Sequence, residues 1–179
     1  MSNMKYKFDL VNKKYYESIY EYRRQLLNTG SETDGCSNLE DYEDIEKWDL
    51  QCKLFEKDDT LPPGYSIGFQ YVYLDENNDV VGMINLRPKA SEHPFLRQYG
   101  GHIGYNIRPD KRGLGIGKQM LKDFLIVCKR EYGLNEVMIS CMKHNDASRR
   151  IIIDNGGVYE ASVIYPPENE LLERYWISL

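Results

Sequence analysis

The sequence predicts a mixed α/β fold with about seven strands and about four helices, in one domain that spans residues 1–179. Strand-like segments with two-residue periodicity alternate with segments of helical periodicity, and a hairpin signal lies near the middle of the chain. No repeat or low-complexity linker interrupts this order. With 179 residues, 41% of them hydrophobic and 12% aromatic, the chain can bury one sizeable core.

The first third of the chain predicts one strand followed by two helices. Residues 5–11 alternate as a strand does, and residues 13–28 place apolar side chains at helical spacing. Gly30 ends that helix, and residues 31–38 have the composition of a loop. The helical pattern returns over residues 39–57 and stops before a Pro-Pro-Gly run.

The middle of the chain predicts three strands. Residues 66–74 and 80–86 are strand-like, and the Asp-Glu-Asn-Asn-Asp run between them supplies turn residues, so we expect an antiparallel hairpin. A polar connection then leads to a further strand over residues 101–107.

The last third alternates helix and strand before a final strand pair. Residues 117–132 place their apolar side chains on one helical face, with basic residues near the end and a glycine as a cap. Residues 136–142 indicate a buried strand and residues 145–155 a short helix that two glycines close. The last two strands are predicted at 158–164 and 171–178.

The charge balance and the cysteines exclude several classes of function. The chain has 23 basic and 28 acidic residues, a net charge of -5, which argues against nucleic acid or an anionic membrane surface as a partner. The four cysteines lie too far apart for a CxxC metal or redox pair, so we expect them reduced and mostly buried. No apolar run approaches the roughly 18 residues of a membrane span, so a cytoplasmic location is the expectation.

A glycine-rich segment between the strand at 101–107 and the helix at 117–132 predicts a phosphate-binding loop. A helix N-terminus exposes unpaired N–H groups and the positive end of the helix dipole. Glycines at positions 113, 115 and 117 lack the side chains that would keep a phosphate from the backbone.

The spacing of these glycines excludes two common phosphate-binding motifs. A P-loop requires Ser or Thr after Gly117-Lys118, where this chain has Gln119. A dinucleotide-binding GxGxxG motif requires a third glycine, and the two possible registers place Met120 or Lys118 there.

The segment Arg112-x-x-Gly115-x-Gly117 resembles the [RQ]xxGx[GA] pyrophosphate-binding motif of the GNAT acetyltransferases. The resemblance extends over residues 80–160 and includes Asn145-x-x-Ser148. It implies a GNAT-like fold, in which a mixed, mostly antiparallel sheet is splayed at its middle and flanked by helices. It also implies a single GNAT N-acetyltransferase domain and acetyl-CoA as cosubstrate, without a metal.

The resemblance also implies which residues bind the cofactor. The main chain of Ile107 would pair with the pantetheine arm, and Arg112 would neutralise phosphate charge. Asn145 would bond the pantetheine directly or through water, or else act only as a helix N-cap. The remaining expected contacts to the pyrophosphate are Gly113, Leu114, Gly115, Ile116, Gly117 and Lys118.

Two residues are candidates for proton transfer in a direct attack of the amine on the acetyl group. Many relatives use a glutamate near the fourth strand, which has no carboxylate here, so His102 is the candidate base; a histidine hydrogen-bonded within the sheet is the alternative. Many relatives protonate the thiolate with a tyrosine, whose place is taken by Ile152. Relatives with Asn-x-x-Ser that modify protein N-termini indicate Ser148 instead, and ordinary helix packing is its alternative.

The predicted activity is an N-acetyltransferase that acts on a small-molecule or peptide amine, with no nucleic acid or membrane partner; a homodimer is compatible with it. Acidic residues on the first two helices favour a cationic amine or form only a solvated surface. These residues are Glu17, Glu21, Asp41, Glu43, Asp44 and Glu46. A noncatalytic acyl-CoA sensor and a nucleotide-binding regulatory module are the alternative functions.

Overall fold

The computed structural model describes residues 5–179, which divide into two compact units. The first unit contains the described residues up to Leu86 together with Gly104–Ile116. The second contains Arg87–Ile103 and Gly117–Leu179.

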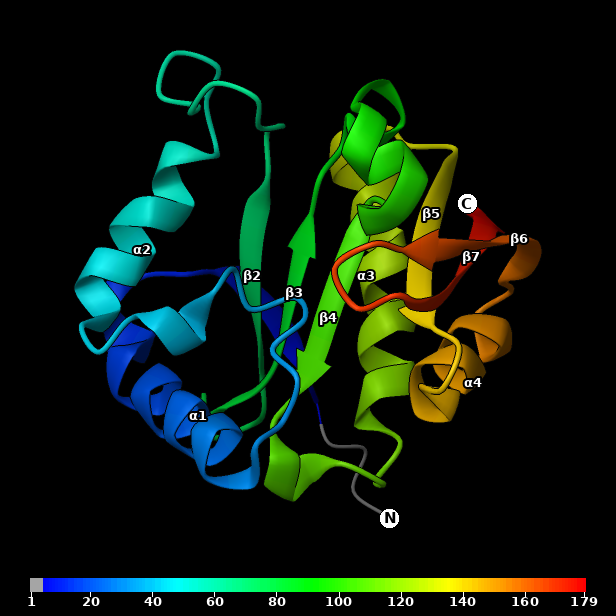
Figure 1. Cartoon of the computed structure of the whole chain (residues 1–179). Coiled ribbons are helices and arrows are strands. Elements are labelled where there is room, and N and C mark those ends of the chain that lie inside the picture. The colour runs from blue at the N-terminus through cyan, green and yellow to red at the C-terminus, as the bar shows by residue number, and fades with distance from the viewer. Residues whose placement is uncertain (1–4) are drawn as a thin grey trace. The chain divides into compact units, whose positions relative to one another are not determined.

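The first unit is built on a four-stranded sheet in the order β1-β2-β3-β4, in which β2 pairs antiparallel with both β1 and β3. Its strands are β1 (Lys7–Leu10), β2 (Phe69–Leu74), β3 (Val80–Leu86) and β4 (Ile103–Ile107). Its helices are η1 (Lys13–Tyr15), α1 (Tyr16–Thr29), η2 (Leu39–Asp41), α2 (Ile45–Leu54) and η5 (Pro109–Lys111). Helix α1 packs against β3, α2 packs against β2, and the two helices contact each other (Figure 1).

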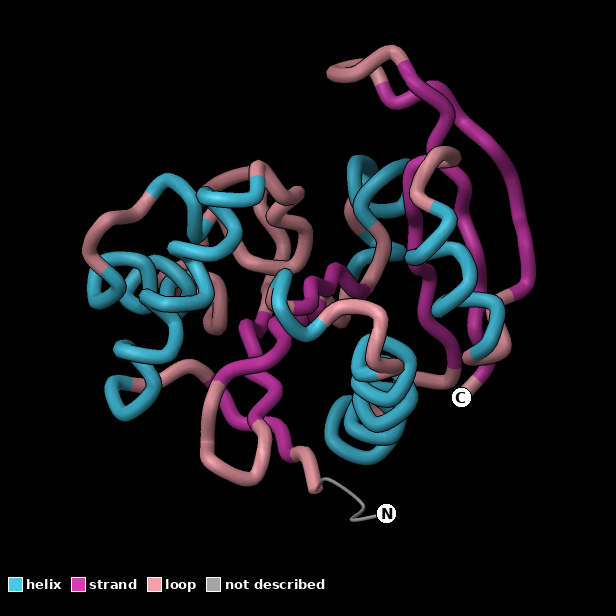
Figure 2. The backbone as a smooth tube through the Cα atoms, turned by 90° about the horizontal axis from the view of Figure 1, so that it is seen from below, coloured by secondary structure: helices cyan, strands magenta, loops and turns pink. Residues whose placement is uncertain are grey.

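The second unit contains a three-stranded sheet in the order β5-β7-β6, in which β7 pairs antiparallel with both neighbours. Its strands are β5 (Glu136–Met142), β6 (Val158–Tyr165) and β7 (Glu170–Ser178), and β7 leads to the C terminus (Figure 2). Its helices are η3 (Ala90–Glu92), the π-helix η4 (Leu96–Gly100), α3 (Ile116–Tyr132) and α4 (Asp146–Asp154). Both η4 and α4 pack against β5.

The core of the first unit follows from the periodicity of α1. Ile19, Tyr22 and Leu26 are each at most 1% exposed and lie on one helical face. They pack with Trp48, whose indole N–H donates to the carbonyl of Cys36 at 3.0 Å. This bond ties the segment between α1 and α2 to the core, so the predicted loop at 31–38 has a defined position within its unit.

The mixed α/β architecture with seven strands is confirmed, and so is the antiparallel hairpin of β2 and β3. Gly30 ends α1 as predicted, with φ 58° in the left-handed region that glycine tolerates. The four cysteines are free and buried, as expected.

The single helix predicted over residues 39–57 is wrong. The chain is extended at Tyr42 (φ -114°, ψ 113°), which separates η2 from α2. Asp44 then accepts a hydrogen bond from the N–H of Glu46 at 3.0 Å and caps a new helix. The connection before β4 also contains helical turns that its polar composition did not predict.

Within residues 5–179 no helix combines the length and the apolar character that crossing a membrane requires.

Candidate cofactor site

The loop that follows β4 begins with η5 and continues through two glycines in the left-handed region. Gly113 has φ 74° and Gly115 has φ 79°, and a Cβ built on either would meet no heavy atom within 4 Å. Leu114 between them is 65% exposed. The backbone is therefore accessible at both glycines, and a ligand can approach it closely.

Helix α3 begins at Ile116, directly after Gly115. The first N–H groups of an α-helix have no partner within the helix, and the helix dipole adds positive potential there. A glycine turn leading directly into a helix is a suitable binding site for an anionic group such as a pyrophosphate.

The side chain of Arg112 turns back onto its own unit. Its Nε donates to the carbonyl oxygen of Ile107 at 2.9 Å, and its Nη1 donates to Oγ of Ser31 at 3.0 Å. These bonds use only part of the guanidinium's donor set, so Arg112 combines a bond within the loop with positive charge beside the glycines. The main chain of Ile107 was expected to pair with the pantetheine arm, and its carbonyl already accepts this one hydrogen bond.

Lys118 is held in the second unit by the end of α4. Its ammonium lies 3.0 Å from a carboxylate oxygen of Asp154, and its carbonyl accepts a hydrogen bond from Nδ2 of Asn155 at 3.2 Å. Lys118 was predicted from the motif, whereas these two partners were not. Their contact with Lys118 is tertiary, and local periodicity carries no signal for it.

Asn145 caps α4, because its Oδ1 accepts the N–H of Ser148 at 3.0 Å. Ser148 is half-buried, and its side chain is hydrogen-bonded to the thiol of Cys141. Burial, the largest cause, raises the pKa of that thiol to about 11, so Cys141 is a neutral neighbour of Ser148 at physiological pH.

His102 precedes β4 and is 4% exposed. Its Nδ1 accepts the N–H of Met138 at 2.9 Å, and its Nε2 lies 3.3 Å from Oγ of Ser91. Its ring also meets Trp176 edge-on. Burial, reinforced by the charge of Arg87, lowers the pKa of His102 to about 4. At neutral pH the imidazole is therefore uncharged and both of its nitrogens have a neighbour on the protein.

Two of the acidic residues expected near an acceptor have structural bonds within the first unit. Asp44 caps α2, and Glu21 forms a two-point ion pair with Arg24 at 2.7 Å. Asp49, which was not among the predicted acidic residues, is 1% exposed and accepts a hydrogen bond from the hydroxyl of Tyr16 at 2.6 Å. The sequence pattern of α2 gave no sign of this burial, because a charged residue in an amphipathic helix is expected on the exposed face.

A metal site is not indicated: within residues 5–179, no three or more His, Cys, Asp or Glu side chains gather in an arrangement that could hold an ion.

Comparison with known proteins defines the class. The family model of the Acetyltransferase (GNAT) domain matches residues 33–158. A search of curated proteins found no match.

Solved structures with the same fold are distant in sequence. The ribosomal L7/L12 alpha-N-protein acetyltransferase RimL, in complex with coenzyme A, is 15% identical with a TM-score of 0.72, over 99% of this chain and 96% of that one. The ribosomal-protein-S5-alanine acetyltransferase from Vibrio fischeri is 16% identical with a TM-score of 0.69, over 97% and 92%. A variant of the spermidine N-acetyltransferase SpeG from Vibrio cholerae is 13% identical with a TM-score of 0.66, over 96% and 94%.

Since the family match covers most of the sequence, the chain belongs to the GNAT acetyltransferase domain family. It is an acyltransferase, and its fold is that of the GNAT enzymes. The two alternatives, an acyl-CoA sensor and a nucleotide-binding module, do not fit this membership.

Proposed function

We propose that this protein transfers the acetyl group of acetyl-CoA directly to the nitrogen of an amine, and that residues 1–179 act as one N-acetyltransferase domain. The observation that carries this proposal is the open backbone at Gly113 and Gly115, directly before α3, inside a GNAT domain. A phosphate-binding turn with no side chain against it is what a pyrophosphate needs.

The residues of the loop fit the cofactor. When bound, acetyl-CoA supplies an acetyl group activated as a thioester. The main chain of Gly113, Gly115 and Gly117 would bind its pyrophosphate, with Arg112 and Lys118 adding positive charge. Flanking positions Leu114 and Ile116 contribute main chain to the same turn. The main chain of Ile107 and the amide of Asn145 are proposed for the pantetheine arm.

Two side chains are proposed for proton transfer, and they differ in what each must do. Ser148 would donate its hydroxyl proton to the leaving thiolate. To do so, its hydroxyl would leave its hydrogen bond with the Cys141 thiol and bond the sulfur of the cofactor instead. His102 would have to give up its bond with the Met138 N–H, or its proximity to Ser91, before it could accept a proton from the amine. Its pKa of about 4 makes it a weak base at pH 7.

A cationic amine is the proposed acceptor class. Residues 31–46 contain several Asp and Glu and neither Lys nor Arg, so this segment of the first unit carries a concentrated negative charge. Negative potential raises the local concentration of cations. Similar solved structures include a spermidine N-acetyltransferase and a ribosomal L7/L12 alpha-N-protein acetyltransferase, and both a polyamine and a peptide N terminus suit such a segment.

An amine panel with detection of released thiol tests the proposal. We expect acetyl-CoA to raise the unfolding temperature of the protein more than ATP does, and a cationic amine from the panel to release free CoA. Turnover should fall at high salt, since screening weakens attraction between exposed charges. A protein that binds acetyl-CoA but acetylates no polyamine or peptide would contradict the acceptor class; one that does not bind acetyl-CoA would contradict the proposal itself.

A further inference from the structure

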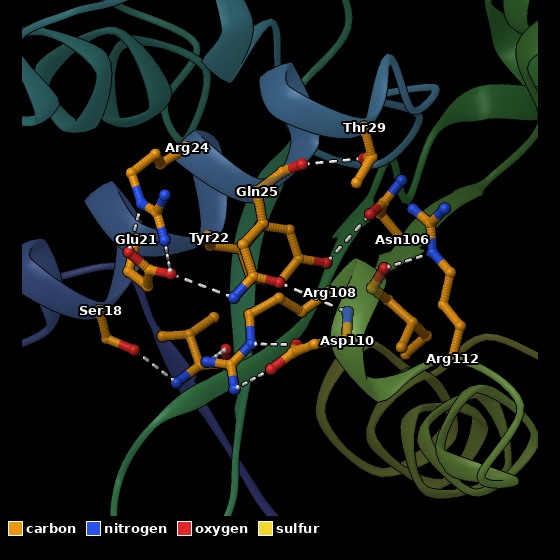
Figure 3. A network of polar contacts seen from close by, with 12 residues as sticks. Ser18, Glu21, Tyr22, Arg24, Gln25, Thr29, Asn106, Arg108, Asp110 and Arg112 are labelled. Carbon is orange, nitrogen blue, oxygen red and sulfur yellow. Dashed lines mark hydrogen bonds and ion pairs between the residues drawn. The ribbon is translucent and has the colours of Figure 1, made fainter.

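A chain of hydrogen bonds connects the last turns of α1 to the loop that follows β4 (Figure 3). All of its members belong to the first unit. We call the residues Gln25, Thr29, Ser31, Arg108, Asp110 and Arg112 the α1 clasp. None of them except Arg112 was singled out by the sequence motif.

Arg108 anchors the start of the loop. It is 8% exposed, and a guanidinium so buried is costly unless its donors are paired. Its Nη1 donates to the carbonyl of Val80 at 3.1 Å, and its Nε and Nη2 donate to the two carboxylate oxygens of Asp110 at 2.7 and 3.3 Å. The two-point pair closes a tight turn around Pro109, whose ring fixes φ. Residues 108–110 are therefore rigid relative to β3.

Gln25 joins this turn to α1. Its Oε1 accepts the backbone N–H of Asp110 at 3.4 Å, and its Nε2 donates to Oε1 of Glu21 at 3.1 Å. Glu21 in turn accepts hydrogen bonds from Nε and Nη2 of Arg24. The amide nitrogen of Gln25 is thus held by Glu21 of α1, while its amide oxygen bonds the loop.

The end of α1 holds the loop at a second point. The hydroxyl of Thr29 donates to the backbone carbonyl of Gln25 at 2.8 Å and lies 2.6 Å from the hydroxyl of Ser31. Ser31 in turn accepts the Nη1 of Arg112, whose Nε bonds the carbonyl of Ile107. The segment from Ile107 to Arg112 is therefore bonded to α1 at Asp110 and at Arg112. Gln25 takes part in the first connection through its side chain and in the second through its backbone carbonyl.

We propose that the α1 clasp positions the phosphate-binding loop, so that Gln25 and Ser31 set the affinity for acetyl-CoA without contacting it. This inference rests on the proposed function of the loop. Gly113 directly follows the clasped segment, and its left-handed backbone has no side chain to stabilise it. The direction of the N–H groups from Gly113 onward therefore depends on how firmly residues 107–112 are held. In this arrangement Arg112 positions the loop through its bonds to Ser31 and Ile107, in addition to the positive charge that it adds.

The test compares two acetyl donors that differ in whether they carry a pyrophosphate. Gln25→Leu removes both bonds of the amide, and Ser31→Ala removes the hydroxyl partner of Arg112. Each variant should raise KM for acetyl-CoA about fivefold, the value of one typical hydrogen bond. For S-acetylpantetheine, which has no pyrophosphate, kcat/KM should stay within about twofold, since Gly113 and the residues after it, which the clasp is proposed to orient, serve the pyrophosphate.

Asn28→Leu is the matched control, because it makes the same amide-to-leucine change on an exposed position of α1. It should leave both donors unaffected. Ser31→Thr keeps a hydroxyl and should restore the KM of the wild type. Should Gln25→Leu fail to fold, as judged by its unfolding temperature, Ser31→Ala and Ser31→Thr carry the test.

Two results would overturn the inference: an unchanged KM for acetyl-CoA in Gln25→Leu and Ser31→Ala, or an equal loss with both donors, which indicates a general structural effect. Both outcomes leave the proposed function intact, since the wild-type protein would still bind acetyl-CoA. A wild-type protein that does not bind acetyl-CoA contradicts the proposed function directly, whatever the variants do.

Discussion

The cofactor loop of the first unit and the proton-transfer candidates of the second use their polar groups in opposite ways. At Gly113 and Gly115 the backbone faces open space, and the bonds that hold the loop come from residues before the glycines. His102 and Ser148 are each hydrogen-bonded within the protein, as is another residue of the second unit, the pantetheine candidate Asn145. Binding of a phosphate at these two glycines therefore needs no exchange of bonds within the protein, whereas proton transfer by His102 or Ser148 does.

The open loop predicts that Gly115→Glu abolishes binding of acetyl-CoA. The carboxylate would occupy the space of the pyrophosphate and repel it, and we expect an affinity loss of more than about 100-fold, or 2.7 kcal/mol. Titration calorimetry with acetyl-CoA measures this.

Gly133→Glu is the matched control for Gly115→Glu. Gly133 has φ 65°, also in the left-handed region, and a Cβ there would meet no atom within 4 Å. Both variants therefore carry a similar backbone cost of roughly 1–2 kcal/mol. Equal loss of affinity in the two proteins would show that strain, not occupation of the loop, is responsible.

His102 predicts a pH dependence of stability. Its pKa is about 4 in the folded state and near 6.5 when unfolded, so the unfolded chain binds more protons between these values. The contribution of His102 to the free energy of unfolding should thus be fully present above pH 6.5. It should decline by roughly 3 kcal/mol as the pH falls to 4.

His102→Gln should flatten this decline, because glutamine does not titrate. Urea unfolding at pH 7.5 and pH 5 measures both proteins. The pH profile of kcat/KM then addresses the proposed base: an inflection near pH 6–7 that disappears in His102→Gln would assign catalysis to this ring and contradict its neutral, bonded state.

The two regions also differ in how far the sequence could predict them. Strand periodicity with turn residues was sufficient to predict the hairpin, and a glycine after a helical pattern was sufficient to predict the end of α1 at Gly30. Both signals are local in the sequence. The break at Tyr42 was missed, since apolar spacing continues across it and only the cap at Asp44 marks the new helix. The glycine loop was found from spacing alone, and its binding role remains a prediction.

Contacts between distant residues account for what the sequence could not predict. The strand predicted at 101–107 included His102, but its pattern contained no information about Met138 or Ser91. The motif identified Arg112 as a cation, while its partner Ser31 lies 81 positions away. A motif indicates which residue types a site uses; only the fold shows which of their donors the protein already occupies.

Ser148→Ala tests whether a bonded side chain can exchange its partner during turnover. Because Ser148 is the proposed proton donor to the thiolate, its removal should lower kcat by about 100-fold, the low end of general acid catalysis. The Kd for acetyl-CoA should change less than about twofold. Ser162→Ala on β6, where the hydroxyl bonds Tyr159, serves as control and should leave kcat unchanged. An unchanged kcat in Ser148→Ala would leave the residue only its contact with Cys141.

Asn145 gives the smallest expected effect and separates the two uses of one side chain. Asn145→Ala removes the cap of α4 and should lower the free energy of unfolding by about 1 kcal/mol. Asn145→Asp keeps an oxygen that can accept the N–H of Ser148 but loses the amide donor, so it should retain the stability of the wild type. If the amide also bonds the pantetheine arm, Asn145→Asp should still bind acetyl-CoA about fivefold more weakly. Wild-type affinity in Asn145→Asp would restrict Asn145 to capping, and the proton-transfer region would then contribute nothing to cofactor binding through this residue.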